Sequence, residues 1–585
     1  MAALPTTKEK NEKNTAALFG APTDPDPYGR DGVRPLTVTA MLFSGKAEKE
    51  VSGEYQLPDY FGDAKRILCC SAQPRCSEPE ENESGFSLSG ETVFTVWFET
   101  AEGRLRCLTH SEDFSLLFRL PQGHAADCPV PGDGIRHSAE CTSVSCRLLS
   151  PKKIGLKCRV EGTAEKAGTL TPGPGAAIPG SGPEERSHFE EKRQTAEAMR
   201  QLFCEEKDVA VSEDVDLGPD AGEIDEIIGC SVTVIPAGCS AENGVFSVTC
   251  EAELRGVYSL PKTPSEEEEN AAERFRGFSK TFRISETVCP DGFRADFLTA
   301  ASSSALSTLV SCRAGEIKLR VAENSYGERK LLEVDFPLDI EVGAFRNECG
   351  SAVTDLFSTV SPCRAEYADT AFPLLTKTVS ASFSQSAAHK AAEGEAENGA
   401  EVLCVSVEPK ISSCEAENGK LTVSGESAVT VIAQKSDGGL CCAAFSEPFT
   451  LISDIPSGSH DVRIQTVCVH GARAREENGT VYADYSLYLS ALVTDEETIR
   501  CVCSVRCEPV PAADFHSSGT CLRICYPEKG ATLWDVAKKY RSSLSALCAE
   551  NALCAENALC AENVLGIVGA DQPVSGPLFI PGDNN

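Results

Sequence analysis

One internal spacing occurs three times along this chain, and it constrains the fold more than any other feature of the sequence. In each copy, a short apolar segment is followed nineteen positions later by a segment in which apolar and polar side chains alternate. The paired segments begin at Ile67 and Phe86, at Ile227 and Phe246, and at Val402 and Leu421. The chain therefore carries one structural unit three times.

The second segment of each copy predicts a β-strand. Phe246 and Val248 alternate with Ser247 and Thr249, a period of two that places apolar side chains on one face of a strand. A turn signal precedes each segment, namely Glu83-Ser84-Gly85, Asn243-Gly244 and Asn418-Gly419. Asn-Gly tolerates positive φ at both central positions of a hairpin turn. We therefore expect an antiparallel hairpin in each copy.

A third landmark follows the second segment at a fixed interval in two copies. Phe114 lies twenty-eight residues after Phe86, and Phe449 lies twenty-eight residues after Leu421. In the middle copy the matching segment, Phe282-Arg283-Ile284, comes eight residues late. The acidic stretch 263–270 accounts for this delay, and we expect it to form an enlarged surface loop between two strands.

The copies divide the chain into domains and linkers. In chain order, we expect a disordered leader (1–35), a first β repeat (36–163), a Pro/Gly-rich linker (164–190), a second β repeat (191–345), a third β repeat (346–508), a second linker (509–520) and a C-terminal domain (521–582). A chain of 585 residues suits about three to five domains. The predicted fold class is mainly β, with three tandem sandwich-like or barrel-like repeats ahead of a small α+β domain.

Several segments carry a local prediction. Phe94, Val96 and Phe98 alternate with Val93 and Trp97, so this strand is apolar on both faces and should lie in the middle of a sandwich or barrel. We further expect short strands at 36–42 and 55–59, a helix-permissive segment at 187–205, a loop at 387–400, and separate strands at 480–493 and 499–507.

The charge and the cysteines limit the partners and the compartment. A net charge of −34 argues against sequence-independent binding to nucleic acid or to an anionic membrane. The N-terminal residues contain no apolar run of signal-peptide length, and no stretch approaches the length of a membrane helix. The expected location is the cytoplasm. The 29 cysteines are odd in number and many occupy apolar strand positions, so we interpret them as reduced thiols.

The C-terminal segment predicts the order strand, helix, helix, strand. We expect strands at 522–526 and 577–581, and helices from about 530 to 540 and from 544 to 551. Thr532 is the expected N-cap of the first helix. Trp534 belongs either to the core or to a binding groove, and the core is favoured because Leu533, Val536 and Ala537 continue its helical face.

These residues resemble a known family. The tail resembles a LysM domain in its helix ending Ala537-Lys538-Lys539-Tyr540, in the Leu-x-x-x-Asn pattern and in a final Leu578-x-Ile580-Pro581. The three upstream units resemble the SPOCS domain of clostridial proteins through Leu57-Pro58-Asp59, Ile67 and Gly90-Glu91. Together the likeness covers nearly all of 36–581. It implies a spore-coat morphogenetic protein of the mother cell that interacts with a sporulation ATPase.

The tail departs from the LysM pattern in two places. Ala531 stands where the pattern has an Asp, so the start of the first helix lacks its usual carboxylate. Ala-Leu-Cys-Ala-Glu-Asn also occurs three times in succession, over 546–563. Six residues advance a helix by about 600°, so the repeated leucines cannot share one face. We therefore expect a protruding or looped-out insertion rather than an extended amphipathic helix.

Signals for enzymatic chemistry are weak, and we expect no catalytic residues and no cofactor. The sequence has no phosphate-binding loop, no Gly-x-Ser-x-Gly motif and no His-Glu-x-x-His motif. Five cysteines form the densest thiol cluster: Cys501, Cys503, Cys507, Cys521 and Cys525. Their spacing lacks a Cys-x-x-Cys pair, so a packed strand face is favoured over a metal site.

The resemblance implies a binding surface in the tail. LysM domains bind N-acetylglucosamine-containing glycans between two loops, which correspond here to Gly530, Ala531, Thr532 and Leu533 facing Gly569, Ala570 and Asp571. Two hypotheses follow. The chain is either a non-enzymatic scaffold of spore-coat assembly that docks on a coat protein through this surface and self-associates through strand edges, or a cell-wall protein that binds peptidoglycan.

Overall fold

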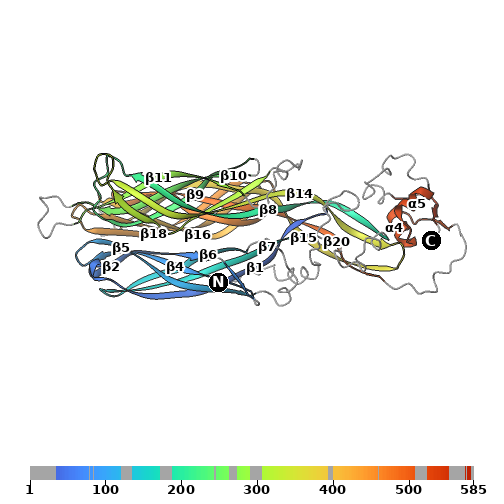
Figure 1. The fold of residues 1–585 in the computed structure, drawn as a ribbon, viewed down its shortest axis with the longest axis horizontal. Coiled ribbons are helices and arrows are strands. Elements are labelled where there is room, and N and C mark those ends of the chain that lie inside the picture. Colours follow the sequence, from blue (N-terminus) through green and yellow to red (C-terminus); the bar gives the residue numbers. More distant parts are fainter. Residues whose placement is uncertain are drawn as a thin grey trace.

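The computed structural model describes residues 35–119, 135–171, 188–261, 273–289, 306–392, 399–507, 523–551 and 573–581, apart from 78, 83, 84, 243, 244, 459 and 575. The chain is mainly β, as predicted. The molecule is elongated, with three β units at one end and the C-terminal tail at the other (Figure 1). No helix in these ranges has the length and apolar character needed to cross a membrane. The predicted leader lies almost entirely outside the described residues.

The first β unit contains two antiparallel sheets. One has the order β1-β7-β6, and the other has the order β2-β4-β3 with β5 also paired to β4. A single apolar core, which includes Phe94, Phe98, Leu116 and Ile154, lies between them. The elements are β1 (Val38–Gln56), η2 (Asp59–Phe61), β2 (Ala64–Cys76), β3 (Glu80–Asn82), β4 (Gly85–Thr100), β5 (Leu105–Arg119), β6 (Ile135–Ser150) and β7 (Lys153–Leu170).

The second β unit also has two antiparallel sheets around one core. Strands β12 and β13 pair with one edge of β14, strand β8 pairs with its other edge, and the facing sheet has the order β11-β10-β9. The strands are β8 (Phe189–Asp216), β9 (Ile227–Glu242), β10 (Val245–Ser259), β11 (Phe275–Val288), β12 (Ser307–Ala314), β13 (Lys318–Ala322) and β14 (Leu331–Ser358). Its core includes Phe246, Leu254, Leu338 and Ile340, contributed by both sheets.

The third β unit repeats this plan with two three-stranded sheets, β15-β20-β19 and β16-β17-β18. The strands are β15 (Cys363–Lys390), β16 (Glu401–Glu417), β17 (Lys420–Gln434), β18 (Leu440–Asp454), β19 (Asp461–Glu477) and β20 (Thr480–Cys507). Both sheets contribute to its core, for example through Leu421 and Val423 of β17 and Leu487 and Leu489 of β20.

The predicted hairpins are present, and one landmark needs correction. Strand β10 pairs with β9, and β17 pairs with β16 across a turn in which Asn418 and Gly419 have φ of 54° and 80°. Phe114 lies opposite Gly90, and Phe449 lies opposite Gly425. In the second unit, Cys250 occupies the position that corresponds to Gly90 and Gly425, and the residue opposite it is Ile284 rather than Phe282. The insertion therefore displaces this strand by ten residues rather than eight.

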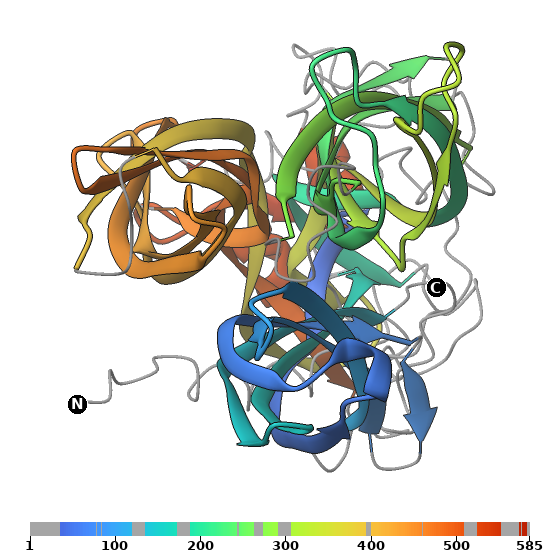
Figure 2. The same ribbon diagram turned by 90° about the vertical axis from the view of Figure 1, so that its left-hand side faces the viewer.

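The three β units lie around a common axis (Figure 2). An apolar junction cluster joins them and consists of Trp97, Leu105, Ile228, Val257, Phe275, Leu403, Ile432 and Leu440. Trp97, Val257 and Ile432 come from the central strands β4, β10 and β17. Strand β4 is buried on both faces, but not by layers of one sandwich as expected: Phe94 and Phe98 face the core of their own unit, while Trp97 faces the neighbouring units.

Polar contacts also cross between the β units. The side chain of Gln434, 7% exposed, accepts a hydrogen bond from the Phe275 N–H at 3.0 Å. Arg66 donates to the carbonyl of Leu440 at 2.7 Å, and Arg463 forms an ion pair with Glu165. These bonds satisfy polar groups that the junction removes from water, so they favour one arrangement of the three units.

Two long ladders extend from the β units toward the tail and form a stem (Figure 1). Strand β8 pairs with β14, and β15 pairs with β20, over 28-residue strands, whereas β1 and β7 have only 19 and 18 residues. Val353, Leu356, Val502 and Val505 are buried between the ladders. The expected boundary between the second and third repeats, at 345–346, falls inside β14.

Other local predictions were wrong where long ladders form. The helix-permissive segment 187–205 lies largely in β8, because pairing with β14 outweighs its local preference. Strand β1 contains both 38–42 and 55–56, so the expected segments 36–42 and 55–59 share one strand, and Asp59 already begins η2. The two expected strands after 480 are one strand, β20. Strand β15 extends to Lys390, into the expected loop. The linker residues 172–187 and 509–520 lie outside the described residues.

Candidate functional site

The C-terminal tail has the predicted order of elements. It contains β21 (Arg523–Cys525), α4 (Leu533–Tyr540), α5 (Leu544–Glu550) and β22 (Leu578–Ile580), and β21 and β22 pair antiparallel. Trp534, Ala537 and Leu547 are at most 2% exposed and form a small core with Cys525 and Ile580. Trp534 is therefore a core residue, as favoured by the helical spacing of its neighbours.

The predicted N-cap at Thr532 is confirmed. Its hydroxyl accepts the Asp535 N–H at 3.2 Å, while the Asp535 carboxylate accepts the Thr532 N–H at 2.9 Å. This reciprocal pair satisfies two donors at the start of α4. The hydrogen bonds from the Thr532 backbone and side chain lower the pKa of Asp535. Asp535 thus supplies a carboxylate at the helix start although position 531 is alanine.

The first predicted binding loop lies against the segment that precedes β22. Thr532 forms an antiparallel bridge with Pro573, and the Val574 N–H donates to the Ala531 carbonyl at 2.9 Å. Gly530 is exposed with φ of +90°, whereas Leu533 is 7% exposed and points into the core. Gly569, Ala570 and Asp571 lie outside the described residues. The loop 530–532 therefore contacts Pro573 and Val574, which follow the second half of the predicted site, 569–571, in the sequence.

The first hexapeptide copy fixes α5 to β22. Leu547 is fully buried, and the Asn551 side chain donates to the Phe579 carbonyl and accepts the Phe579 N–H, both at 2.7 Å. Asn551 thereby pairs with β22 as a neighbouring strand would. The residues of this first copy form the last turn of α5. The second and third copies, 552–563, lie outside the described residues.

One carboxylate of the stem holds α4 in place. Asp355, on β14, accepts hydrogen bonds from Trp534 Nε1 at 2.7 Å, from Lys538 Nζ at 2.7 Å and from the Tyr367 hydroxyl at 2.5 Å. Burial opposes ionisation of Asp355, but these donors outweigh it and lower the pKa of the carboxyl group. Phe357 also packs edge-on against Trp534, with ring centroids 5.0 Å apart.

The sequence reasoning missed this contact. Asp355 and Tyr367 lie more than 160 residues before α4, and no spacing or motif connects them to the tail. The available signal is weak, since Asp355 is a single acidic residue in the otherwise uncharged segment 349–363.

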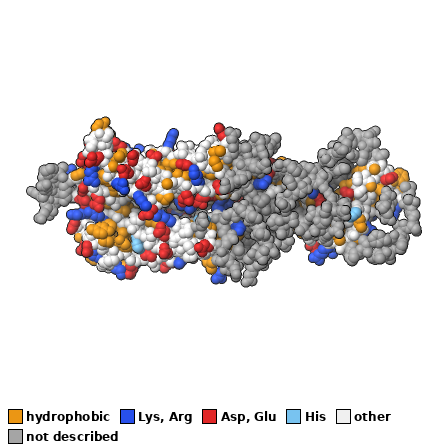
Figure 3. All heavy atoms as spheres, viewed as in Figure 1, with side chains coloured by type: hydrophobic (Ala, Val, Ile, Leu, Met, Phe, Trp, Pro, Cys, Tyr) orange, Lys and Arg blue, Asp and Glu red, His pale blue; other side chains and the backbone are white. Residues whose placement is uncertain are grey.

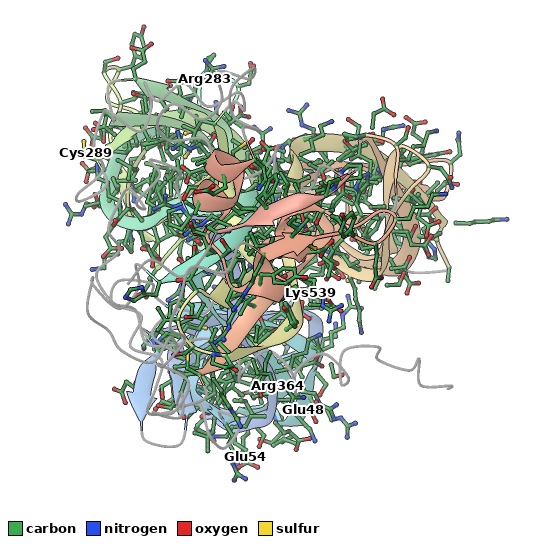
Figure 4. The ribbon with its side chains drawn as sticks, turned by 90° about the vertical axis from the view of Figure 1, so that its right-hand side faces the viewer. Glu48, Glu54, Arg283, Cys289, Arg364 and Lys539 are labelled. Carbon is green, nitrogen blue, oxygen red and sulfur yellow. The ribbon has the colours of Figure 1, made fainter. Side chains whose placement is uncertain are left out.

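The face of the tail sheet that points away from this core carries large apolar side chains. Ile524 and Phe579 are cross-strand partners and are 48% and 41% exposed, and Tyr526 is 78% exposed. Lys539 is exposed on α4 at the same end of the molecule (Figure 4). The tail thus presents both the loop 530–532, exposed at Gly530, and an apolar strip that consists of Ile524, Tyr526 and Phe579.

Comparisons with protein-family models, with curated proteins and with solved structures gave no match. A function for this chain is therefore inferred from its own residues and from their arrangement.

The cysteine cluster near the end of the third unit is spread over different environments. Cys501 is buried at the base of the stem, the Cys503 thiol contacts the Glu366 carbonyl, and Cys507 lies near Cys363. Cys525 belongs to the tail core, and Cys521 lies outside the described residues. Within the described ranges, no group of three or more His, Cys, Asp or Glu side chains has an arrangement that could hold a metal ion.

Proposed function

We propose that this chain is a non-enzymatic scaffold of spore-coat assembly, built from three tandem repeats of one β domain and a LysM-like tail. The observation that carries the proposal is the position of the tail, which is fixed to the end of the stem by Asp355 and Phe357. A binding module held at one end of an elongated body suits a protein that connects two structures.

The tandem repeats are supported by the equivalent strand pairing of the three β units. Phe114, Ile284 and Phe449 occupy matching positions opposite Gly90, Cys250 and Gly425. The LysM-like assignment is supported by the strand–helix–helix–strand order and by the role of Asn551. Acidic and basic side chains are interspersed over the visible face of the β units (Figure 3), which suits selective protein contacts better than binding to a polyanion.

The partner in this proposal is a protein of the coat basement layer, the sporulation ATPase, in the mother-cell cytoplasm. The apolar strip of Ile524, Tyr526 and Phe579 supports a protein contact because partly exposed aromatic side chains are typical anchors of protein interfaces. The alternative is peptidoglycan binding. It is favoured by the exposed Gly530 and by the pairing of loop 530–532 with Pro573 and Val574, which follow the second predicted glycan loop in the sequence.

Two parallel assays on the full chain separate these functions. The protein is used as bait in an extract of sporulating cells, and it is also sedimented with purified peptidoglycan. Tyr526→Ala tests the strip, and Tyr60→Ala is the matched control because Tyr60 is equally exposed, at 79%, but lies in the first β unit. Capture of the ATPase that Tyr526→Ala weakens at least tenfold, without sedimentation, is the expected result.

Sedimentation with peptidoglycan and no capture of the ATPase would overturn the scaffold proposal in favour of the alternative. Equal effects of Tyr526→Ala and Tyr60→Ala on capture would retain the ATPase as a partner and exclude the strip as its contact.

A further inference from the structure

Two pairs of cysteines each connect the two sheets of one β unit. In the second unit, Sγ of Cys250 on β10 lies 3.3 Å from Sγ of Cys312 on β12. In the first unit, Cys70 on β2 and Cys146 on β6 border the same core from contacting strands, and their interaction raises the pKa of Cys70 and lowers the pKa of Cys146. In both cases the two strands belong to different sheets, with no backbone ladder between them among the described residues.

The geometry of the better-defined pair is close to that of a disulfide. An S–S bond is about 2.05 Å long, so the sulfur atoms of Cys250 and Cys312 need to approach by only about 1.3 Å. Cys250 is fully buried between Ile284 and Pro236, while Cys312 is half-buried on the facing sheet.

We propose that Cys250–Cys312 and Cys70–Cys146 are redox-sensitive pairs that close to disulfides and covalently join the two sheets of the second and first β units. The oxidant is a low-molecular-weight disulfide, RSSR. The more accessible thiol attacks it as a thiolate, forms a mixed disulfide and releases one RSH. The partner thiolate then attacks the protein sulfur and releases the second RSH. Two thiols are oxidised and one RSSR is reduced to two RSH.

The environment of the second pair supports this order of steps. Cys312 is the accessible thiol, and Cys250 is positioned to attack the mixed disulfide because it is already in contact with Cys312. In the reduced pair, the hydrogen bond between the two thiols lowers the pKa of Cys250 and raises the pKa of Cys312, so Cys312 attacks as a thiolate only after this hydrogen bond breaks. The proposal is independent of the proposed function, since it concerns only the β units.

The third close thiol pair differs in its position. Cys141 and Cys158 have sulfurs 4.0 Å apart, but they lie on β6 and β7, which already pair in one ladder. A bond there would join strands that backbone hydrogen bonds hold together, so this pair provides an internal comparison.

The test is oxidation of the reduced full-length protein with oxidised glutathione, followed by peptide mapping without reduction. We expect links between Cys250 and Cys312 and between Cys70 and Cys146, with the loss of four of the 29 free thiols. The thermal midpoint should rise by roughly 5 °C, since a disulfide removes conformational freedom from the unfolded chain. Cys312→Ala should abolish one link and Cys146→Ala the other, each leaving the remaining link intact.

Cys289→Ala is the control because Cys289 is exposed at the rim of the second unit (Figure 4), and this substitution should leave both links unchanged. Stable glutathione adducts on Cys312 and Cys146 without internal links would overturn the proposal. A Cys141–Cys158 link formed while the two proposed pairs stay reduced would also overturn it. Peptide mapping of the unsubstituted protein decides these outcomes even where a variant fails to fold.

Discussion

Asp355 shows how a single side chain positions the tail. Its carboxylate accepts hydrogen bonds from an indole N–H, a lysine ammonium group and a tyrosine hydroxyl, two of them from α4 and one from β15. The Asp355 side chain is 20% exposed and that of Lys538 is 40% exposed. Charge-assisted hydrogen bonds with this degree of burial are stronger than surface ion pairs, so this contact contributes more to docking than its small size indicates.

Replacing Asp355 with alanine should therefore loosen the tail. The substitution leaves Trp534 Nε1 and Lys538 without their acceptor at a partly buried interface, with an expected cost of about 3 kcal/mol. Hydrogen exchange of the α4 amides should accelerate by roughly a hundredfold. Asp369→Ala is the matched control, since Asp369 is exposed on β15, and it should leave exchange in α4 unchanged. Similar exchange in both variants would show that Phe357 and the apolar contacts suffice for docking.

At the scale of the elements, the β8–β14 ladder combines favourable packing with a local electrostatic conflict. Asp208 lies opposite Asp339, and Glu206 lies opposite Glu341, at neighbouring positions of the same ladder. Burial, followed by the charge of Asp208, raises the pKa of Asp339. Like charges that face each other across two strands are destabilising, and the length of the ladder compensates for them.

Asp339→Asn should stabilise the protein at neutral pH by about 0.5 kcal/mol, because it removes one of the two facing charges. The raised pKa means that ionisation of Asp339 disfavours the folded state, so stability is lost as the pH rises through this pKa. The advantage of the variant should therefore be present at pH 7 and absent near pH 3. Denaturant unfolding at both pH values measures it. Asp335→Asn, at an exposed position of β14 opposite Ser212 and Lys318, removes no pair of like charges and should give no stabilisation, and an equal gain there would contradict the explanation.

At the scale of the whole molecule, close backbone approach decides how the three β units fit together. A Cβ atom at Gly277 would lie 2.3 Å from the Leu403 carbonyl oxygen, which belongs to the third unit. A Cβ atom at Gly229 would lie 2.8 Å from the ring of Trp97 in the first unit. In the first unit Cys107 lies opposite Trp97, and in the third unit Cys442 lies opposite Ile432. At the corresponding position of the second unit, Gly277 lies opposite Val257. The three units therefore differ in the residues that meet at this junction.

Gly277→Ala should separate the second and third units, because a backbone oxygen cannot move aside as a flexible side chain can. We expect a loss of about 1–3 kcal/mol in the free energy of unfolding and a measurable increase in the radius of gyration by X-ray scattering. Gly238→Ala is the matched control, since Gly238 lies on a neighbouring strand with open space around its Cβ position. An unchanged radius for Gly277→Ala would show that the units remain associated through the other junction contacts.

The sequence by itself determined the features that depend on local pattern. Alternation and Asn-Gly turns predicted the hairpins, and the cap at Thr532, the helical spacing around Trp534 and the final Leu-x-Ile-Pro predicted the order of the tail elements. These predictions succeed because the residues concerned interact with near neighbours in the chain. The first loop of the candidate site, 530–533, was implied by the resemblance to LysM domains, and Leu533 in it proved to be a core residue.

Only the tertiary structure decided where long strands continue and what they contact. Residues 189–205 form a strand because β14 supplies their hydrogen-bond partners, and β20 continues without interruption because β15 pairs with it throughout. The second face of β4, the glycines at the junction and the contact of Asp355 with α4 all depend on partners more than 100 residues away. A linear pattern records which face of a strand is apolar, whereas the partner that covers that face is selected by packing of the whole chain.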